Sequence, residues 1–340
     1  MIAFPSLAFL IFGVAYALVS LVFAIIFRDG VLGEILSSVS GGLDISLRYF
    51  WAMALVITAW AVRSGIKRGA PLRVAVGNVA AIYAATFALH FGFTLFKTTM
   101  PEIVPHYADP YLAAVDAWLH GQSDPWSVID RLIGSARMIQ LTPLYQGPWL
   151  VAAFLFPVIL VASDDNPERV KRYLVLYCCS WIVIGNIIAL GGMSVGPVFY
   201  DRFYGSARFE GLTRTLDEAG LAHTTMGMLQ DYLWSMFAAG REGFGTGISA
   251  FASVHVSVAT VIALYCGERS PLLAVPSGLF CGMVLLLSVW SGYHYAVDGY
   301  VSIATVALIW AGLRRWSRSS ATGKAPARYA LDERLDASRD

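Results

Sequence analysis

Long apolar runs separated by short polar stretches dominate the hydrophobic pattern of this 340-residue chain. A hydrocarbon core about 30 Å thick needs roughly 20 apolar residues in a helix. Eight runs approach that length, the second and sixth being the shortest: 5–27, 46–62, 74–96, 146–163, 172–192, 249–266, 272–290 and 295–313. The pattern predicts an all-α membrane protein, a polytopic bundle of about eight transmembrane helices.

Basic residues gather after the second, fourth and last runs, and they set the expected orientation. The three clusters are Arg63, Lys67, Arg68 and Arg73; Arg169, Lys171 and Arg172; Arg314, Arg315 and Arg318. Cytoplasmic loops are enriched in Lys and Arg, and eight spans place all three clusters on one side only if both termini are cytoplasmic. The run 5–27 has no basic residue before it and exceeds the roughly 7–15 residues of a signal-peptide core, so we expect a retained span.

Two connections, 97–145 and 193–248, are too long for simple turns, and this topology puts both on the outer side. In the first, apolar residues recur every three to four positions among aspartates, with Trp118 and Trp126 as interface anchors. We expect interfacial helices on the outer membrane surface. A cap packed over the bundle is an equally good interpretation.

Composition agrees with a membrane protein and excludes other classes. Apolar residues make up 57% and charged residues 14% of the chain, against roughly 25% charged in soluble domains. A net charge of +1 gives no reason to expect a nucleic-acid partner. The four cysteines lie inside apolar runs and lack the spacing of a zinc site or disulfide framework.

Two histidines lie at the outer ends of predicted spans. From His255 the sixth run goes inward for roughly 18 Å and the seventh returns for roughly 28 Å, so His294 emerges near the depth of His255. Asp298, four residues after His294, can accept a hydrogen bond from one ring nitrogen. Taken singly, each could be a hydrogen-bonded interhelical residue, but together they favour a reaction centre.

The stretch "REGFGTGISAFASVH" precedes the first of these histidines. Gly243, Gly245 and Gly247 lead into a helix start predicted near Ser249, where free N–H groups form an anion site. Ser249 and Ser253 can add hydroxyl donors on the face of His255. A plain glycine hinge is the alternative interpretation, but beside two histidines the stretch indicates a phosphate-binding site.

Two motifs carry a family resemblance. "SAFASVHVSVA" resembles the Ser-x-x-x-Ser-x-His motif and "HYAVDGY" the His-x-x-x-Asp motif of the type 2 phosphatidic acid phosphatase superfamily, in particular its inositol phosphorylceramide synthase-like branch. The resemblance covers about residues 145–313 and implies a six-helix phosphatase-type core. It implies that His294 attacks phosphorus to give a phosphohistidine, that Asp298 supports it, and that His255 protonates the leaving oxygen. The same resemblance implies that no metal or cofactor is needed.

The chain departs from the family pattern at two positions. Ala252 stands where many members have proline, and Ser288 stands where phosphatase members have arginine. Since a phosphoryl group needs cations, we expect them from Arg202 or Arg241, although each could equally be a solvated loop arginine. The missing arginine is also a feature of the synthase-like branch, which favours transfer over hydrolysis.

These observations predict four segments and one principal function. The segments are N-terminal transmembrane helices (1–97), an outer-face interfacial segment (98–145), a catalytic transmembrane core (146–313) and a polar, disordered cytoplasmic tail (314–340). We expect a metal-independent lipid phosphotransferase with its active site on the periplasmic or luminal side. Its donor would be a phospholipid and its acceptor ceramide, diacylglycerol or another lipid alcohol.

Three alternatives remain open. Water as acceptor would make the protein a phosphatidate or polyprenyl phosphate phosphatase. A proton-coupled transporter could use the same residues as a relay, but relay residues usually lie near the membrane midplane, whereas these lie at span ends. A silent, lipid-binding relative would also fit the sequence.

Overall fold

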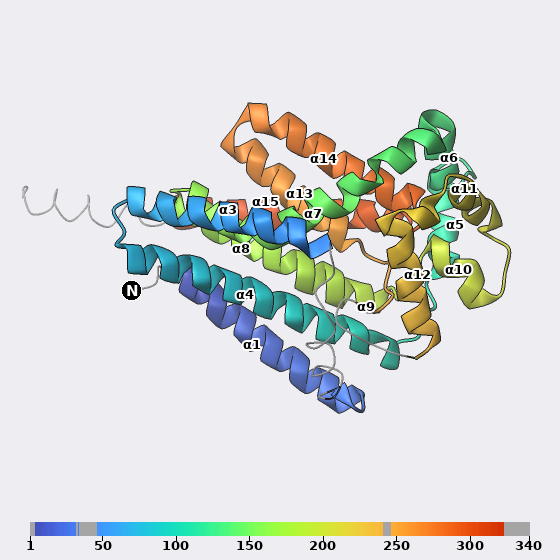
Figure 1. Ribbon diagram of the computed structural model, residues 1–340, viewed down its shortest axis with the longest axis horizontal. Coiled ribbons are helices and arrows are strands. Elements are labelled where there is room, and N and C mark those ends of the chain that lie inside the picture. Colours follow the sequence, from blue (N-terminus) through green and yellow to red (C-terminus); the bar gives the residue numbers. More distant parts are fainter. Residues whose placement is uncertain (1–3, 32, 34–45, 241–245, 323–340) are drawn as a thin grey trace, which may run out of the picture.

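The computed structural model describes residues 4–31, 33, 46–240 and 246–322, and these ranges form helices without strands (Figure 1). Long helices correspond to the eight predicted runs. They are α1 (Phe4–Phe27), α3 (Ser46–Lys67), α4 (Leu72–Thr99), α7 (Ser135–Ser163), α8 (Pro167–Cys179) continued by the π-helical η2 (Ser180–Ile188) and α9 (Ala189–Gly191), α13 (Val254–Arg269), α14 (Pro271–Trp290) and α15 (Ala296–Thr322). The predicted all-α polytopic membrane fold is confirmed.

In the described part of the chain, six helices are long and apolar enough to cross a membrane. They comprise residues 5–27, 72–102, 135–163, 167–191, 271–290 and 296–317. The other two predicted spans fall short. Helix α3 carries Arg48 near its start and Arg63 near its end, which shortens its apolar stretch. Helix α13 has only 16 residues.

Helix α13 is short because it begins at Val254 and not near Ser249, so the predicted start is wrong. Ser253 is the N-cap: its backbone is extended (φ −74°, ψ 108°), and its side chain accepts a hydrogen bond from the Val256 N–H at 3.3 Å. A serine at this position satisfies one of the free N–H groups of the first turn. Residues 246–253 are therefore a non-helical approach to the helix.

Two other predicted boundaries also differ. Helix α7 begins at Ser135, well before the predicted 146, and α15 continues to Thr322, beyond the predicted 313. The backbone hydrogen bonds of a helix do not depend on apolar side chains, so a helix can extend past the edge of its apolar run. The predicted tail is therefore helical up to Thr322, and residues 323–340 lie outside the described part.

The long helices pack as a bundle. Helices α1 and α4 lie side by side, α3 packs on α4 and α7, and α13 and α14 form an antiparallel hairpin against α15 (Figure 1). The main core fills the space between α7, α8 with η2, α13, α14 and α15, and includes the fully buried Tyr173, Tyr177 and Trp290. The two candidate histidines belong to the hairpin and to its link with α15.

Shorter helices from the two long connections gather at one end of the bundle, on the right in Figure 1, and form what we call the cap. It consists of η1 (Met100–Glu102), α5 (Asp109–Leu119), α6 (Pro125–Ile133), α10 (Pro197–Tyr204), α11 (Glu210–Glu218), η3 (Leu221–His223) and α12 (Thr225–Ala238). Helix α5 buries Asp109, Ala113 and Asp116 and leaves Tyr111 and Trp118 70% exposed. Helix α5 therefore packs on the bundle through one face and presents two aromatic side chains on the other. The position of the cap relative to a membrane surface stays a prediction.

Candidate active site

His294 lies in the tight connection between α14 and α15. Gly292 permits this turn: it has φ +74°, and a Cβ added there would lie 2.7 Å from Leu212 Cδ2. The His294 N–H donates to the carbonyl of Ser288 at 3.1 Å, which folds the connection back onto the end of α14. His294 is only 7% exposed. The backbone thus holds the imidazole at the boundary between bundle and cap.

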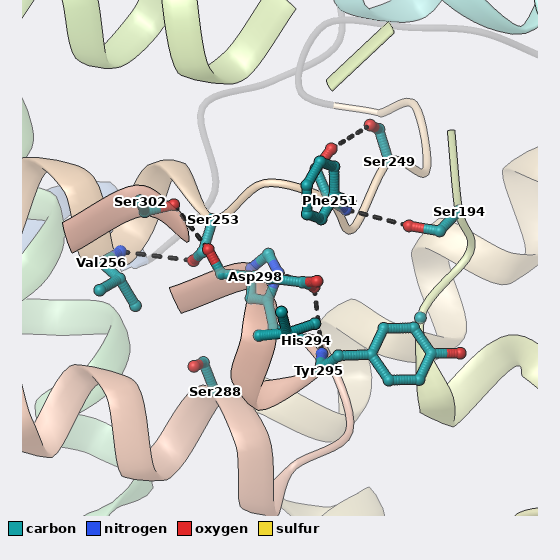
Figure 2. A network of polar contacts seen from close by, with 12 residues as sticks. Ser194, Ser249, Phe251, Ser253, Val256, Ser288, His294, Tyr295, Asp298 and Ser302 are labelled. Atoms are coloured by element: carbon teal, nitrogen blue, oxygen red, sulfur yellow. Dashed lines mark hydrogen bonds and ion pairs between the residues drawn. The ribbon is translucent and has the colours of Figure 1, made fainter. Parts of the chain in front are cut away.

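Asp298 orients the His294 ring (Figure 2). Its Oδ2 accepts a hydrogen bond from His294 Nδ1 at 3.3 Å and another from the Tyr295 N–H at 3.0 Å, and its side chain is fully buried. A carboxylate only accepts hydrogen bonds, so Nδ1 carries the proton, and in the neutral imidazole Nε2 then keeps its lone pair. The pair predicted from the four-residue spacing is therefore present in a form that leaves Nε2 available as a nucleophile.

His255, the second residue of α13, lies beside His294. The two ring centroids are 6.1 Å apart, with the rings inclined at 60°. Trp149 packs on the His255 ring at 3.9 Å, and Tyr145 stacks on it at 4.8 Å. The Trp149 indole N–H also donates to the His255 carbonyl at 3.1 Å. Two aromatic residues of α7 thus hold the second histidine in place.

Two buried aspartates of α5 fix the backbone around His294. Asp116 accepts hydrogen bonds from the N–H groups of Ala296 (2.8 Å) and Val297 (2.9 Å), the first residues of α15. Asp109 accepts from the Tyr295 hydroxyl at 3.0 Å and from the N–H groups of Val195 and Gly196.

Burial raises the pKa of both carboxyls, whereas these N–H donors act in the opposite direction by favouring the anions. This role of the two aspartates was not predicted, although Asp109, Ala113 and Asp116 recur at the spacing of one helix face.

The two serines predicted to bind phosphate form hydrogen bonds with backbone groups in this structure (Figure 2). Ser253 caps α13, and the Ser249 hydroxyl donates to the Phe251 carbonyl at 3.5 Å, so the two do not share a helix face. The missed partner is Ser194, whose Oγ accepts from the Phe251 N–H at 3.0 Å and whose carbonyl accepts from the Ala250 N–H at 2.9 Å. Residues of the 193–202 segment thus hold the approach to His255.

The remaining phosphate-binding candidates in the described part of the chain contact other helices. Gly247 has φ +89° and packs against Thr98 at the end of α4. The Arg202 guanidinium is 3.8 Å from Asp231 and 5.9 Å above the Trp234 ring, so it interacts with α12. Arg241, Gly243 and Gly245 lie outside the described residues.

A cavity of about 10 Å³ adjoins His294 beneath the cap. Its lining includes Ala113, Asp116, Trp126, Pro197, Phe209 and Tyr295. This volume holds about one water molecule. A lipid headgroup can therefore reach this side of His294 only if cap side chains move.

Comparison with known proteins places this geometry within one family segment. A family model described as the PAP2 superfamily matches residues 110–312, more than half of the chain. The segment contains His255, His294 and Asp298, and leaves α1, α3 and α4 outside. Neither curated proteins nor solved structures gave a match.

Proposed function

The chain belongs to the PAP2 superfamily of phosphatases and phosphotransferases, and from this membership we propose that it is a lipid phosphotransferase. It moves a phosphoryl-containing headgroup from a phospholipid to a lipid alcohol through a phosphohistidine on His294. The observation that carries the proposal is the pair of histidine rings 6.1 Å apart, one of them bonded to a buried carboxylate. Because this superfamily consists of enzymes, membership in it also argues against the proton-coupled transporter.

The proposed reaction has two steps. In the first, His294 Nε2 attacks phosphorus, the bond from phosphorus to the leaving oxygen breaks, and His255 gives that oxygen a proton. In the second, His255 takes the proton of the acceptor hydroxyl, whose oxygen attacks phosphorus as the bond from Nε2 to phosphorus breaks. Asp298 holds the Nδ1 proton throughout and stabilises the positive charge that the ring gains.

Transfer is the first choice because position 288 holds a serine, as in the inositol phosphorylceramide synthase-like branch that the motifs resemble. Hydrolysis is the second candidate, since water can replace the alcohol in the same chemistry. The cavity of about 10 Å³ beside His294 favours hydrolysis, because the cavity has room for one water molecule. The reaction product distinguishes the two.

The test uses the purified full chain in detergent with EDTA. Labelled phospholipids and lipid phosphates are offered with and without ceramide, diacylglycerol or another lipid alcohol. His294→Ala is compared with the wild type and with His223→Ala, which removes an exposed histidine of the cap. We expect a transferred headgroup from the wild type and His223→Ala, and a loss of about 10⁴-fold or more in His294→Ala.

Other outcomes have clear meanings. Released phosphate in place of a transferred headgroup would select the phosphatase. Turnover that survives in His294→Ala would exclude His294 as the nucleophile. Acid-labile, alkali-stable label on wild-type protein that is missing from the variant would identify the phosphohistidine directly.

A further inference from the structure

The proposed phosphoryl transfer requires a positive group near the histidines. In the described family segment, Arg208 is held by two hydrogen bonds to Asp124, which lines the cavity beside His294. Negative charge on the phosphoryl oxygens must be stabilised by donors or cations held close to phosphorus. Position 288 holds a serine, and Arg202 faces Asp231 and Trp234. A cation from outside residues 110–312 would meet this need.

One face of α4 is directed toward His255. His90, Phe93 and Lys97 recur at spacings of three and four, so they share a helix face. The ring centroids of His90 and Phe93 lie 4.2 Å and 4.9 Å from that of Trp181. Trp181 in turn neighbours Trp149, with centroids 6.2 Å apart, and Trp149 packs on His255. A continuous aromatic wall therefore links this face to the site.

Closer contacts place the last turn of α4 beside the start of α13. A Cβ added at Gly185 would lie 2.7 Å from the Phe93 ring and 2.6 Å from the side chain of Val254, the residue before His255. Phe93 and Val254 thus pack on the same stretch of backbone. A Cβ added at Gly247 would lie 3.2 Å from Thr98, the neighbour of Lys97. The end of α4 therefore borders the approach to His255 at Gly247.

Lys97 follows Phe93 by one helical turn, about 6 Å further toward the cap end of α4. Its side chain is half-buried, and it lies close enough to His255 for the charges of the two groups to interact. A lysine carries its ammonium on a flexible four-carbon stem, which can follow a phosphoryl group between two acceptors.

We propose that Lys97 supplies the cation of the phosphate site, so that a helix outside the family segment completes the active site. This inference rests on the proposed function and names the group that would neutralise its substrate. The ammonium would donate to a phosphoryl oxygen on the His255 side while Nε2 of His294 forms its bond to phosphorus.

The test compares Lys97→Met and Lys97→Arg with Lys67→Met, which removes an exposed lysine from the last turn of α3. Turnover of the best wild-type substrate, inhibition by orthovanadate and the melting temperature are measured for each. We expect Lys97→Met to lose about 10²–10³-fold in kcat/KM and to bind vanadate at least ~10-fold more weakly, with a melting temperature within ~2 °C of the wild type. Lys97→Arg should retain most activity and Lys67→Met all of it.

Turnover and vanadate inhibition in Lys97→Met within about threefold of the wild type, less than the effect of one lost charged hydrogen bond, would overturn the proposal. If Lys97→Met does not fold, Lys97→Gln replaces it and the same criterion applies. Failure of the proposed function looks different, because the wild type would then be inactive or match His294→Ala. In that case the increase in melting temperature on adding vanadate tests the role of Lys97. An equal increase in the wild type and in Lys97→Met would overturn that role.

Discussion

At the scale of single residues, removing either of two buried tyrosine hydroxyls should change the melting temperature, and the two changes should have opposite signs. Tyr177 is fully buried, and its hydroxyl donates to the Ala153 carbonyl. Tyr145, whose ring stacks on His255, is 2% exposed, and its hydroxyl has no hydrogen-bond partner among the described residues. A buried unpaired hydroxyl costs about 1–3 kcal/mol and a typical paired one contributes about 1 kcal/mol. We expect Tyr145→Phe to raise the melting temperature in detergent and Tyr177→Phe to lower it. Shifts of the same sign in both variants would contradict this reasoning.

The contacts predicted correctly from sequence are local ones. His294 and Asp298 are four positions apart, and His255 is joined to them through one hairpin, so spacing alone predicts their proximity. Ser249 and Arg202 were assigned by position in a motif, but their partners are set by backbone conformation and by α12. Lys97, which we propose as the cation, comes from a helix remote in sequence, and only the packing at Gly185 and Gly247 brings the end of that helix beside the start of α13.

At the scale of elements, α5 acts on the site through the start of α15. Asp116 accepts from the first two N–H groups of α15, and such N-terminal groups have no partner within their own helix. In Asp116→Asn, the side-chain amide replaces one acceptor oxygen with a second donor. We expect a loss of about 1–3 kcal/mol of stability and a lower kcat, because His294 lies two residues before the helix.

Glu210→Gln is the control for Asp116→Asn, because it also replaces a carboxylate of a cap helix with an amide. Its carboxylate pairs with Arg214 at 2.9 Å, where the two side chains are 64% and 65% exposed. Ion pairs near the surface contribute about 0–1 kcal/mol. Denaturation in detergent and initial rates are measured on both variants. Equal effects on stability and rate would mean that Asp116 has no special role in holding α15.

Element boundaries were less predictable than the elements. The apolar pattern locates the eight long helices, because burial in a bilayer demands a minimum length of apolar residues. It misplaces the starts of α7 and α13 and the end of α15, since these depend on capping and on helix that continues outside the apolar run. The cap helix α5 was recognisable from its three- and four-residue spacing, but its buried aspartates gave no sign of their partners.

At the scale of the whole molecule, the basic connections and the candidate active site lie at opposite ends of the bundle. The cap covers the end of the bundle at which α13 begins and α14 ends (Figure 1). The basic connections contain ion pairs that join neighbouring helices, such as Arg172 with Glu268 at 2.6 Å. Because basic loops are retained in the cytoplasm, this separation predicts that the reaction takes place on the periplasmic or luminal side.

Labelling from one side of the membrane tests this orientation. Asp217 on the cap helix α11 and Lys171 on α8 are both exposed, and each can be replaced by cysteine. In sealed right-side-out vesicles, an impermeant maleimide should label Asp217→Cys at once and Lys171→Cys only after the membrane is permeabilised. The unsubstituted chain measures the background from its own four cysteines. The reverse order of labelling would place the histidines on the cytoplasmic side, and the substrate would then have to come from the inner leaflet.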